Sequence, residues 1–177
     1  MTKRAKNMIE NKSSEANRVE GFPPLVGKKP KVLILGTFPG RCSLCCGEYY
    51  ADTSNAFRKI IMEICTGKGA DVTYDNFVKC LDSKHIALWD VHKSCIRKGS
   101  SDKNITNPKP NKMEEFLKDH PTIKKIIFNG KKAEKEFRHS FSELKDKKEL
   151  CCAPSTSSQN RWYSYEEKKL RWQEMLG

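Results

Sequence analysis

The sequence has no long hydrophobic run. No stretch approaches the roughly 18 apolar residues of a membrane-spanning helix. The N-terminal segment MTKRAKNMIENKSSEANRVEG also has no apolar centre of the kind found in signal peptides. We therefore expect no contact with a membrane and a location inside the cell, nuclear or cytoplasmic depending on the organism.

Motifs for nucleotide cofactors, metals and covalent catalysis are also missing. The chain contains no GxxxxGK[ST] phosphate loop and no GxGxxG turn. No serine or cysteine has an evident nucleophile elbow, and no metal-ligand spacing links the histidines, which are His85, His92, His120 and His139. We expect no cofactor, no metal, and a site that holds a planar polar group without attacking it covalently.

Acidic residues are scarce relative to basic ones. The chain has 34 Lys and Arg against 22 Asp and Glu, which gives a formal net charge of +12. A field of this sign attracts polyanions, and nucleic acid is the leading candidate. A solvated lysine-rich surface explains the charge by itself equally well.

The eight cysteines show neither a disulfide framework nor a complete metal site. Cys65, Cys80 and Cys95 stand singly, while 45–46 and 151–152 are adjacent pairs. This pattern is typical of reduced intracellular thiols. The spacing Cys-x-x-Cys at 42–45 is half of a zinc or iron-sulfur motif, but no second half with ligand spacing accompanies it.

Strand-sized apolar runs alternate with helical patterns. The predicted strands are KVLIL at 31–35, HIALWDV at 85–91, IKKIIF at 123–128 and ELCCA at 149–153. Helical spacing of apolar residues predicts helices around 57–64, 77–81, 113–117 and 133–141, and a last one from the Ser164-x-x-Glu167 capping box to Leu176. Because parallel strands need helix-length crossovers, we predict an α/β fold, a three-layer α/β/α sandwich with a central four-stranded parallel sheet.

Residues 21–177 are predicted to form this single domain. Residues 1–20 are polar, lysine-rich and aperiodic, which predicts a flexible basic tail. Residues 98–112 are rich in Ser, Asn, Pro and Lys and are predicted to be a long loop, functional or disordered. Asp52 and Ser54 are the predicted caps of the helix near residue 57.

Distinctive polar and aromatic segments follow the end of every predicted strand. They are GTFPG after the first, WDVHKSCIRKGSSD through the end of the second, NGKKA after the third and PSTSSQNRW after the fourth. In an open parallel sheet, ligands bind beyond the carboxyl ends of the strands. The four segments therefore predict one shared ligand crevice.

An ordered set of motifs covers about residues 21–176. It comprises GFPPLV at 21–26, KVLILGTFPG at 31–40, YYAD at 49–52, NAF at 55–57, ALWDV at 87–91, FNGKKA at 128–133 and PSTSSQNRWYSYEEKKLRW at 154–172. With these motifs the sequence resembles the uracil-DNA glycosylase superfamily, and within it the hypoxanthine-DNA (deoxyinosine) glycosylase branch. Thr53 and Arg58 stand where that branch usually has proline and tryptophan.

The resemblance implies an α/β glycosylase that acts in DNA repair on damaged DNA. Such an enzyme flips a deaminated base, here expected to be hypoxanthine, and hydrolyses its N-glycosidic bond to leave an abasic site. We expect it to act as a monomer. The alternatives are uracil, xanthine or mismatch specificity, a non-enzymatic nucleic-acid-binding relative, and a small-nucleotide hydrolase.

The resemblance also implies site residues. Asn55 matches the catalytic asparagine, whose carboxamide would orient the attacking water, with Asp52 as the alternative base. In the predicted base pocket, the backbone amides of Gly36, Thr37 and Phe38 bind the base. The rings of Phe38 and Tyr50 stack on the base or pack in the core. Asp90 accepts a hydrogen bond from N1–H of the base or caps a turn.

A further group is predicted to bind DNA. The residues suited to the phosphate backbone are Arg97, Ser100, Ser155, Ser157, Ser158 and Arg161. Gln159 and Asn160 are predicted to enter the space that the flipped base leaves.

Overall fold

The computed structural model describes residues 18–69, 71–99, 101–144 and 148–177. Its centre is a sheet of four parallel strands in the order β3-β2-β6-β7. The strands are β2 (Val32–Gly36), β3 (Ile86–Asp90), β6 (Lys125–Asn129) and β7 (Glu149–Ala153). All four predicted strands are thus confirmed, because their branched apolar side chains are buried by helices on both faces.

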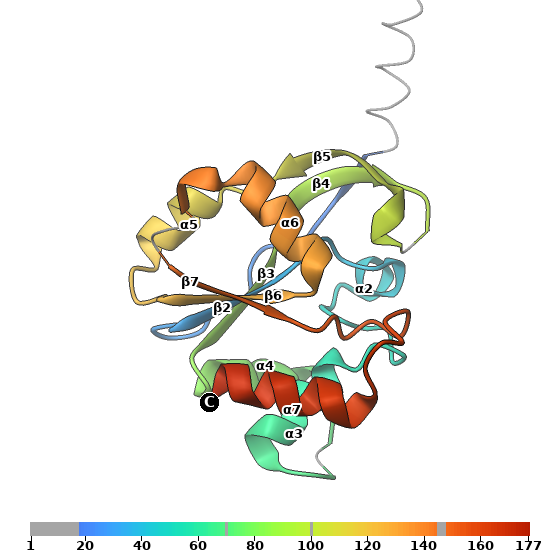
Figure 1. The fold of residues 1–177 in the computed structure, drawn as a ribbon, viewed down its shortest axis with the longest axis vertical. Helices are drawn as coiled ribbons and strands as arrows, with labels where there is room; N and C mark the ends of the chain where they lie inside the picture. Colours follow the sequence, from blue (N-terminus) through green and yellow to red (C-terminus); the bar gives the residue numbers. More distant parts are fainter. Residues whose placement is uncertain (1–17, 70, 100, 145–147) are drawn as a thin grey trace, which may run out of the picture.

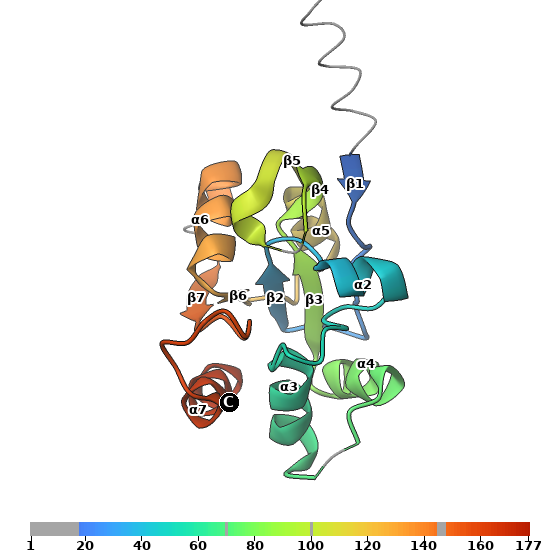
Figure 2. The ribbon, with the colours of Figure 1, turned by 90° about the vertical axis from the view of Figure 1, so that its right-hand side faces the viewer.

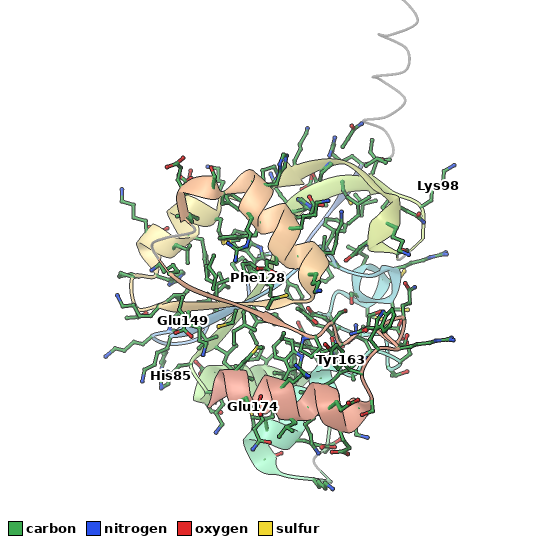
Figure 3. The ribbon with its side chains drawn as sticks, in the orientation of Figure 1. His85, Lys98, Phe128, Glu149, Tyr163 and Glu174 are labelled. Atoms are coloured by element: carbon green, nitrogen blue, oxygen red, sulfur yellow. A yellow bond between two sulfur atoms is a disulfide. The ribbon has the colours of Figure 1, made fainter. Side chains whose placement is uncertain are left out.

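Helices cover the two faces of this sheet and complete the three predicted layers (Figures 1 and 2). One face carries α3 (Phe57–Thr66), α4 (Tyr74–Ser83) and α7 (Tyr165–Leu176). The other carries α5 (Met113–Asp119) and α6 (Lys131–Ser140). The rings of Phe57 and Trp172 pack 5.4 Å apart on the first side, and Phe128 packs 5.1 Å from Phe137 on the second (Figure 3).

The predicted boundary signals of two helices have different outcomes. The capping box at the start of α7 is confirmed, because the Ser164 side chain accepts from the Glu167 N–H and Glu167 accepts from the Ser164 N–H. The predicted caps of α3 are wrong, since its N-cap is Ala56. Asp52 instead accepts hydrogen bonds from the N–H and hydroxyl of Ser54, within the turn that precedes the helix.

A second, antiparallel sheet was not predicted. It has the order β1-β4-β5 and comprises β1 (Arg18–Glu20), β4 (His92–Arg97) and β5 (Ile105–Pro110), with a 3-10 turn, η1 (Asp102–Asn104), between the last two. The long loop predicted at 98–112 therefore contains a strand. Pro108 and Pro110 suggested a loop, but β5 lies at the sheet edge, where a residue without an N–H is tolerated. The last three residues of the predicted tail form β1, and its other residues lie outside the described part.

The cysteine prediction is wrong at one pair. Cys65 of α3 and Cys80 of α4 form a disulfide with a Cα–Cα distance of 6.3 Å, whereas both were expected to be thiols. Isolated cysteines 15 residues apart gave no sign of this pairing, because the packing of α3 on α4 creates it. The remaining six cysteines are free, and three of them lie in or at the end of a short helix that was also not predicted, α2 (Arg41–Cys46).

The register of the parallel sheet aligns its carboxyl ends. Gly36 is paired with Asp90, Leu35 with Phe128, and Asn129 with Ala153. The strand exits therefore meet at one edge of the sheet, as predicted. In the part of the chain that the structure describes, no helix is both long and apolar enough to cross a bilayer.

Candidate active site

A cleft of about 650 Å³ opens at this carboxyl edge and contains residues from all four strand exits. Five of its buried or half-buried lining residues, which we call the floor, are Gly36, Tyr50, Asn55, Asp90 and Asn129. Its exposed lining residues, which we call the rim, include Lys103, Lys131, Lys132, Gln159 and Trp162. The predicted crevice thus exists, and α2 and η1 contribute further walls that were not predicted.

Gly36 is needed at the floor because two polar side chains lie against it. A Cβ at this position would lie 2.4 Å from Asp90 Oδ1 and 3.0 Å from the Tyr50 hydroxyl. Any side chain at residue 36 would therefore displace one of these groups. Tyr50 itself adopts a left-handed conformation with φ of 54°, which turns its side chain toward the cleft floor.

Asn129 connects two parts of the floor and was not among the predicted site residues. Its Nδ2 donates to the Tyr50 hydroxyl at 2.9 Å and to Thr156 Oγ1 at 2.9 Å. Its Oδ1 accepts from the Thr156 N–H at 2.9 Å. The signal in the sequence was an asparagine at the end of the third predicted strand, where the other strands also carry polar residues. Its partners are distant in sequence, so only the tertiary structure identifies them.

Asn55 is held in a turn that two other segments fix. Its N–H donates to the Asp52 carbonyl at 2.9 Å, and its Oδ1 accepts from the Phe57 N–H at 3.0 Å. The next residue, Ala56, donates its N–H to the Thr156 carbonyl at 3.1 Å. Because a carboxamide oxygen can accept two hydrogen bonds, Asn55 keeps one acceptor position and its Nδ2 donors for a water in the cleft.

Asp90 is the most perturbed acid of the cleft. It is 4% exposed, and its Oδ2 has no hydrogen-bond partner. Burial, reinforced by the negative charge of Asp102, raises the pKa of Asp90 to about 8, although Arg97 lowers it. Burial also raises the pKa of Asp102, against the opposing effects of the Thr37 hydroxyl and Arg97. The floor therefore contains a carboxyl group that is neutral at pH 7.

Phe38 and Arg97 are structural in this geometry. Phe38 is 6% exposed, and the Arg97 guanidinium lies 5.1 Å from the centre of its ring. Arg97 also donates to the Pro39 carbonyl and lies 3.8 Å from Asp102, and its side chain is only 2% exposed. Arg97 supports the GTFPG turn in this structure, and its predicted phosphate contact stays a prediction. Ser100 lies outside the described residues.

The PSTSSQN segment is held by hydrogen bonds from helix α7 and from its own side chains. Lys168, buried at 6% exposure, donates to the carbonyls of Ser157 and Asn160 at 3.2 and 2.8 Å, and burial lowers its pKa. Asn160 Nδ2 donates to the Ser155 carbonyl at 2.9 Å. The side chain of Asn160 is therefore tied into its own loop, and the prediction that it fills the space of the flipped base does not fit this structure.

The predicted serines of this segment divide into two groups. The Ser155 and Ser157 hydroxyls accept from the N–H groups of Ser157 and Gln159, at 3.3 and 3.2 Å. Ser158 is exposed, and its hydroxyl lies 3.2 Å from that of Ser54, so it joins this loop to the Asn55 turn. Arg161 is exposed but does not line the cleft.

Trp162 was missed by the sequence analysis. Its side chain lines the cleft and is 91% exposed, on the segment just before Tyr163, which is labelled in Figure 3. An exposed aromatic ring on the wall of a polar cleft offers a flat surface on which a planar group can stack. The signal in the sequence was an aromatic residue directly after the polar loop, where a stacking surface for a base is useful.

Arg58, at the position where the resembled branch usually has tryptophan, packs much as an aromatic residue would. Its guanidinium lies 4.7 Å from the centre of the Tyr74 ring, and its Nε donates to the Tyr49 carbonyl at 2.7 Å. Its Nη2 pairs with Glu48 at 2.9 Å. Arg58 therefore fixes the segment that leads into Tyr50.

No group of three His, Cys, Asp or Glu in the described parts of the chain is arranged to hold a metal ion.

Comparisons with known proteins identify the family of this chain. A family model described as the Uracil DNA glycosylase superfamily matches residues 23–176. A protein named Hypoxanthine DNA glycosylase from Methanosarcina barkeri (strain Fusaro / DSM 804) is 35% identical over 115 residues, covering 64% of this chain and 72% of that protein. A protein of the same name from Methanosarcina acetivorans is 31% identical over 147 residues, covering 81% and 89%.

A solved structure resembles this chain as well. The solution NMR structure of a candidate uracil DNA glycosylase from Methanosarcina acetivorans superposes with a TM-score of 0.75 at 28% identity. The match covers 90% of this chain and 96% of that one.

Proposed function

The chain belongs to the uracil DNA glycosylase superfamily, and from this premise we propose that it excises hypoxanthine from DNA by hydrolysing the N-glycosidic bond of a flipped deoxyinosine. The relatives of similar sequence support a DNA glycosylase, and two of them carry the name of the hypoxanthine enzyme. The base, the flipping step and the roles of the residues are proposals argued from the cleft.

The observation that carries the proposal is the fixed position of Asn55 in a polar, partly buried cleft. Cleavage of a deoxyribosyl bond gives the sugar positive character and the departing base negative character. An enzyme accelerates it by positioning a water at the anomeric carbon and by hydrogen bonding to the base. Asn55 orients this water through its free acceptor position and its amide N–H groups.

The base occupies the rest of the floor. A cleft of about 650 Å³ holds a purine nucleoside. The carbonyls of Gly36 and Thr37 accept from the N–H groups of Val91 and His92, which fixes the direction of the GTFPG turn. The following N–H groups of this turn hydrogen-bond to the lactam edge of the base, and the Asp90 carboxyl faces its imidazole edge at N7.

The rim binds the DNA outside the base. Lys103, Lys131 and Lys132 are exposed beside the cleft and neutralise phosphates without reading sequence. Trp162 stacks on a base next to the lesion, a contact worth about 1 to 3 kcal/mol. The exposed Gln159 is the residue that enters the space left by the flipped nucleotide.

The test is base release from matched duplexes that contain inosine, uracil, xanthine or no lesion, followed by alkali to cut abasic sites. We expect strand cleavage with the inosine duplex and none with the undamaged one. Release of a different base only would reassign the specificity within the same family. Tight binding without release of any base would favour the non-enzymatic relative, and equal cleavage of free nucleosides would favour the nucleotide hydrolase.

A further inference from the structure

The starting observation is an incompletely satisfied acid on the cleft floor. Asp90 ends β3, where the register places it beside Gly36, and it is 4% exposed. Its Oδ2 has no hydrogen-bond partner, although buried polar atoms are nearly always paired. The residue lines the cleft and this oxygen is unpaired beneath the cleft surface, so the carboxyl group keeps hydrogen-bonding capacity next to a bound ligand.

The fold makes room for this acid and holds it in place. Gly36 has no side chain where a Cβ would lie 2.4 Å from Asp90 Oδ1. On the other side of the strand end, Asn111 Nδ2 donates to the Asp90 backbone carbonyl at 2.9 Å. The backbone of Asp90 is therefore fixed at the end of the strand, while its Oδ2 stays without a hydrogen-bond partner.

The surroundings favour the protonated form. The charged and titratable groups that act on Asp90 are Asp102 on η1, Arg97 on β4, and the Tyr49 and Tyr50 hydroxyls on the segment before α3. Burial, the largest influence, and the negative charge of Asp102 together raise the pKa of Asp90 to about 8. Arg97 opposes this, but it is shared with Asp102 at 3.8 Å. An acid whose pKa is raised by the fold is neutral below that pKa, so Asp90 carries a proton up to about pH 8 and loses it above.

We propose that Asp90 is a catalytic general acid whose carboxyl group donates a proton to N7 of the departing hypoxanthine. This inference rests on the proposed function and adds a step to it. Protonation of N7 withdraws electrons from the glycosidic bond, so the base leaves as a neutral molecule instead of an anion.

The step balances. The C1′–N9 bond breaks and its electron pair goes to the base, while the Asp90 proton moves to N7. Water held by Asn55 forms the new C1′–O bond and loses a proton to the solvent. The Asp90 carboxylate is then reprotonated from solvent, and the products are hypoxanthine and an abasic site.

The test combines one substitution with a pH profile of single-turnover hypoxanthine release. Asp90→Asn keeps the shape and neutrality of the protonated acid but cannot transfer a proton. We expect the rate near pH 7 to fall about 100-fold or more, within the range for loss of a general acid. Binding of the inosine duplex should stay within about threefold, because phosphate contacts dominate affinity. Asp119→Asn, an exposed carboxylate at the end of α5, is the matched control and should keep the parent rate.

The pH profile of the parent protein tests the proton transfer even if the variant does not fold. The parent rate should be level below about pH 8 and then decrease about tenfold per pH unit. In Asp90→Asn this decrease near pH 8 should be absent. A parent rate in Asp90→Asn, or the same pH dependence in both proteins, overturns the general acid while leaving the glycosylase intact. If the parent protein releases no hypoxanthine at any pH, the proposed function itself fails.

Discussion

The floor and the rim of the cleft differ in how their side chains are held. On the floor, Asn129 donates hydrogen bonds to Tyr50 and Thr156. Asn55 is fixed by its own turn and by the hydrogen bond from the next residue, Ala56, to the Thr156 carbonyl. On the rim, Lys131 and Trp162 are exposed, and Trp162 is 91% exposed.

This difference suits the floor to catalysis and the rim to DNA binding. Chemistry requires groups placed to within fractions of an ångström, and the hydrogen bonds of the floor provide that placement. Binding to a charged polymer requires only charge and adaptable surface, which the rim provides. Changes on the floor should therefore alter the rate at constant affinity, and changes on the rim should alter the affinity at nearly constant rate.

The largest effect is expected from Asn55→Ala. The substitution removes the amide that positions the water, so single-turnover base release should fall by about 100-fold or more, with duplex binding changed by less than about threefold. Thr53→Ala, in the same turn, is the matched control and should keep the parent rate. If folded Asn55→Ala releases every tested base at the parent rate, Asn55 is structural. The assignment of catalysis to the floor would then be wrong for this residue.

An intermediate effect is expected from Trp162→Ala. Loss of one stacked base should weaken binding to the inosine duplex by about tenfold, within the range for aromatic stacking. The rate at saturating enzyme should change by less than about threefold. Leu170→Ala, which shortens another exposed apolar side chain away from the cleft, serves as the control. Titration with a labelled duplex measures the affinity, and single-turnover base release at saturating enzyme measures the rate. A lower rate at unchanged affinity in Trp162→Ala would show that Trp162 acts in catalysis and not in binding.

The smallest effect is expected from Lys131→Ala. Removing one phosphate contact should weaken binding by about threefold at moderate salt and reduce the slope of log K against log salt by about 0.9. Lys118→Ala makes the same charge change on α5, which lies at the other end of the sheet from α2 and the cleft (Figure 1), and should leave the slope unchanged. Equal slopes for the parent and Lys131→Ala would show that Lys131 does not contact DNA.

The main sheet and its helices were predictable because their signals are local. The four apolar runs became β2, β3, β6 and β7, and the Ser164 capping box starts α7 as predicted. The antiparallel sheet was missed because β5 is exposed and carries two prolines, so that no apolar pattern indicates it. The Cys65–Cys80 disulfide was missed because only the packing of α3 on α4 brings the two sulfur atoms together.

The sequence by itself determined the order of the parallel strands and helices along the chain, and it placed the polar segments at the strand exits. Burial periodicity and capping are properties of neighbouring residues, which is why they can be read along the chain. Only the tertiary structure decided that Arg97 lies against Phe38, that Asn160 closes its own loop, and that Asn129 joins Tyr50 to Thr156. The state of Asp90 was decided there as well, because its pKa depends on burial and on Asp102 and Arg97, which approach it only when the two sheets are assembled.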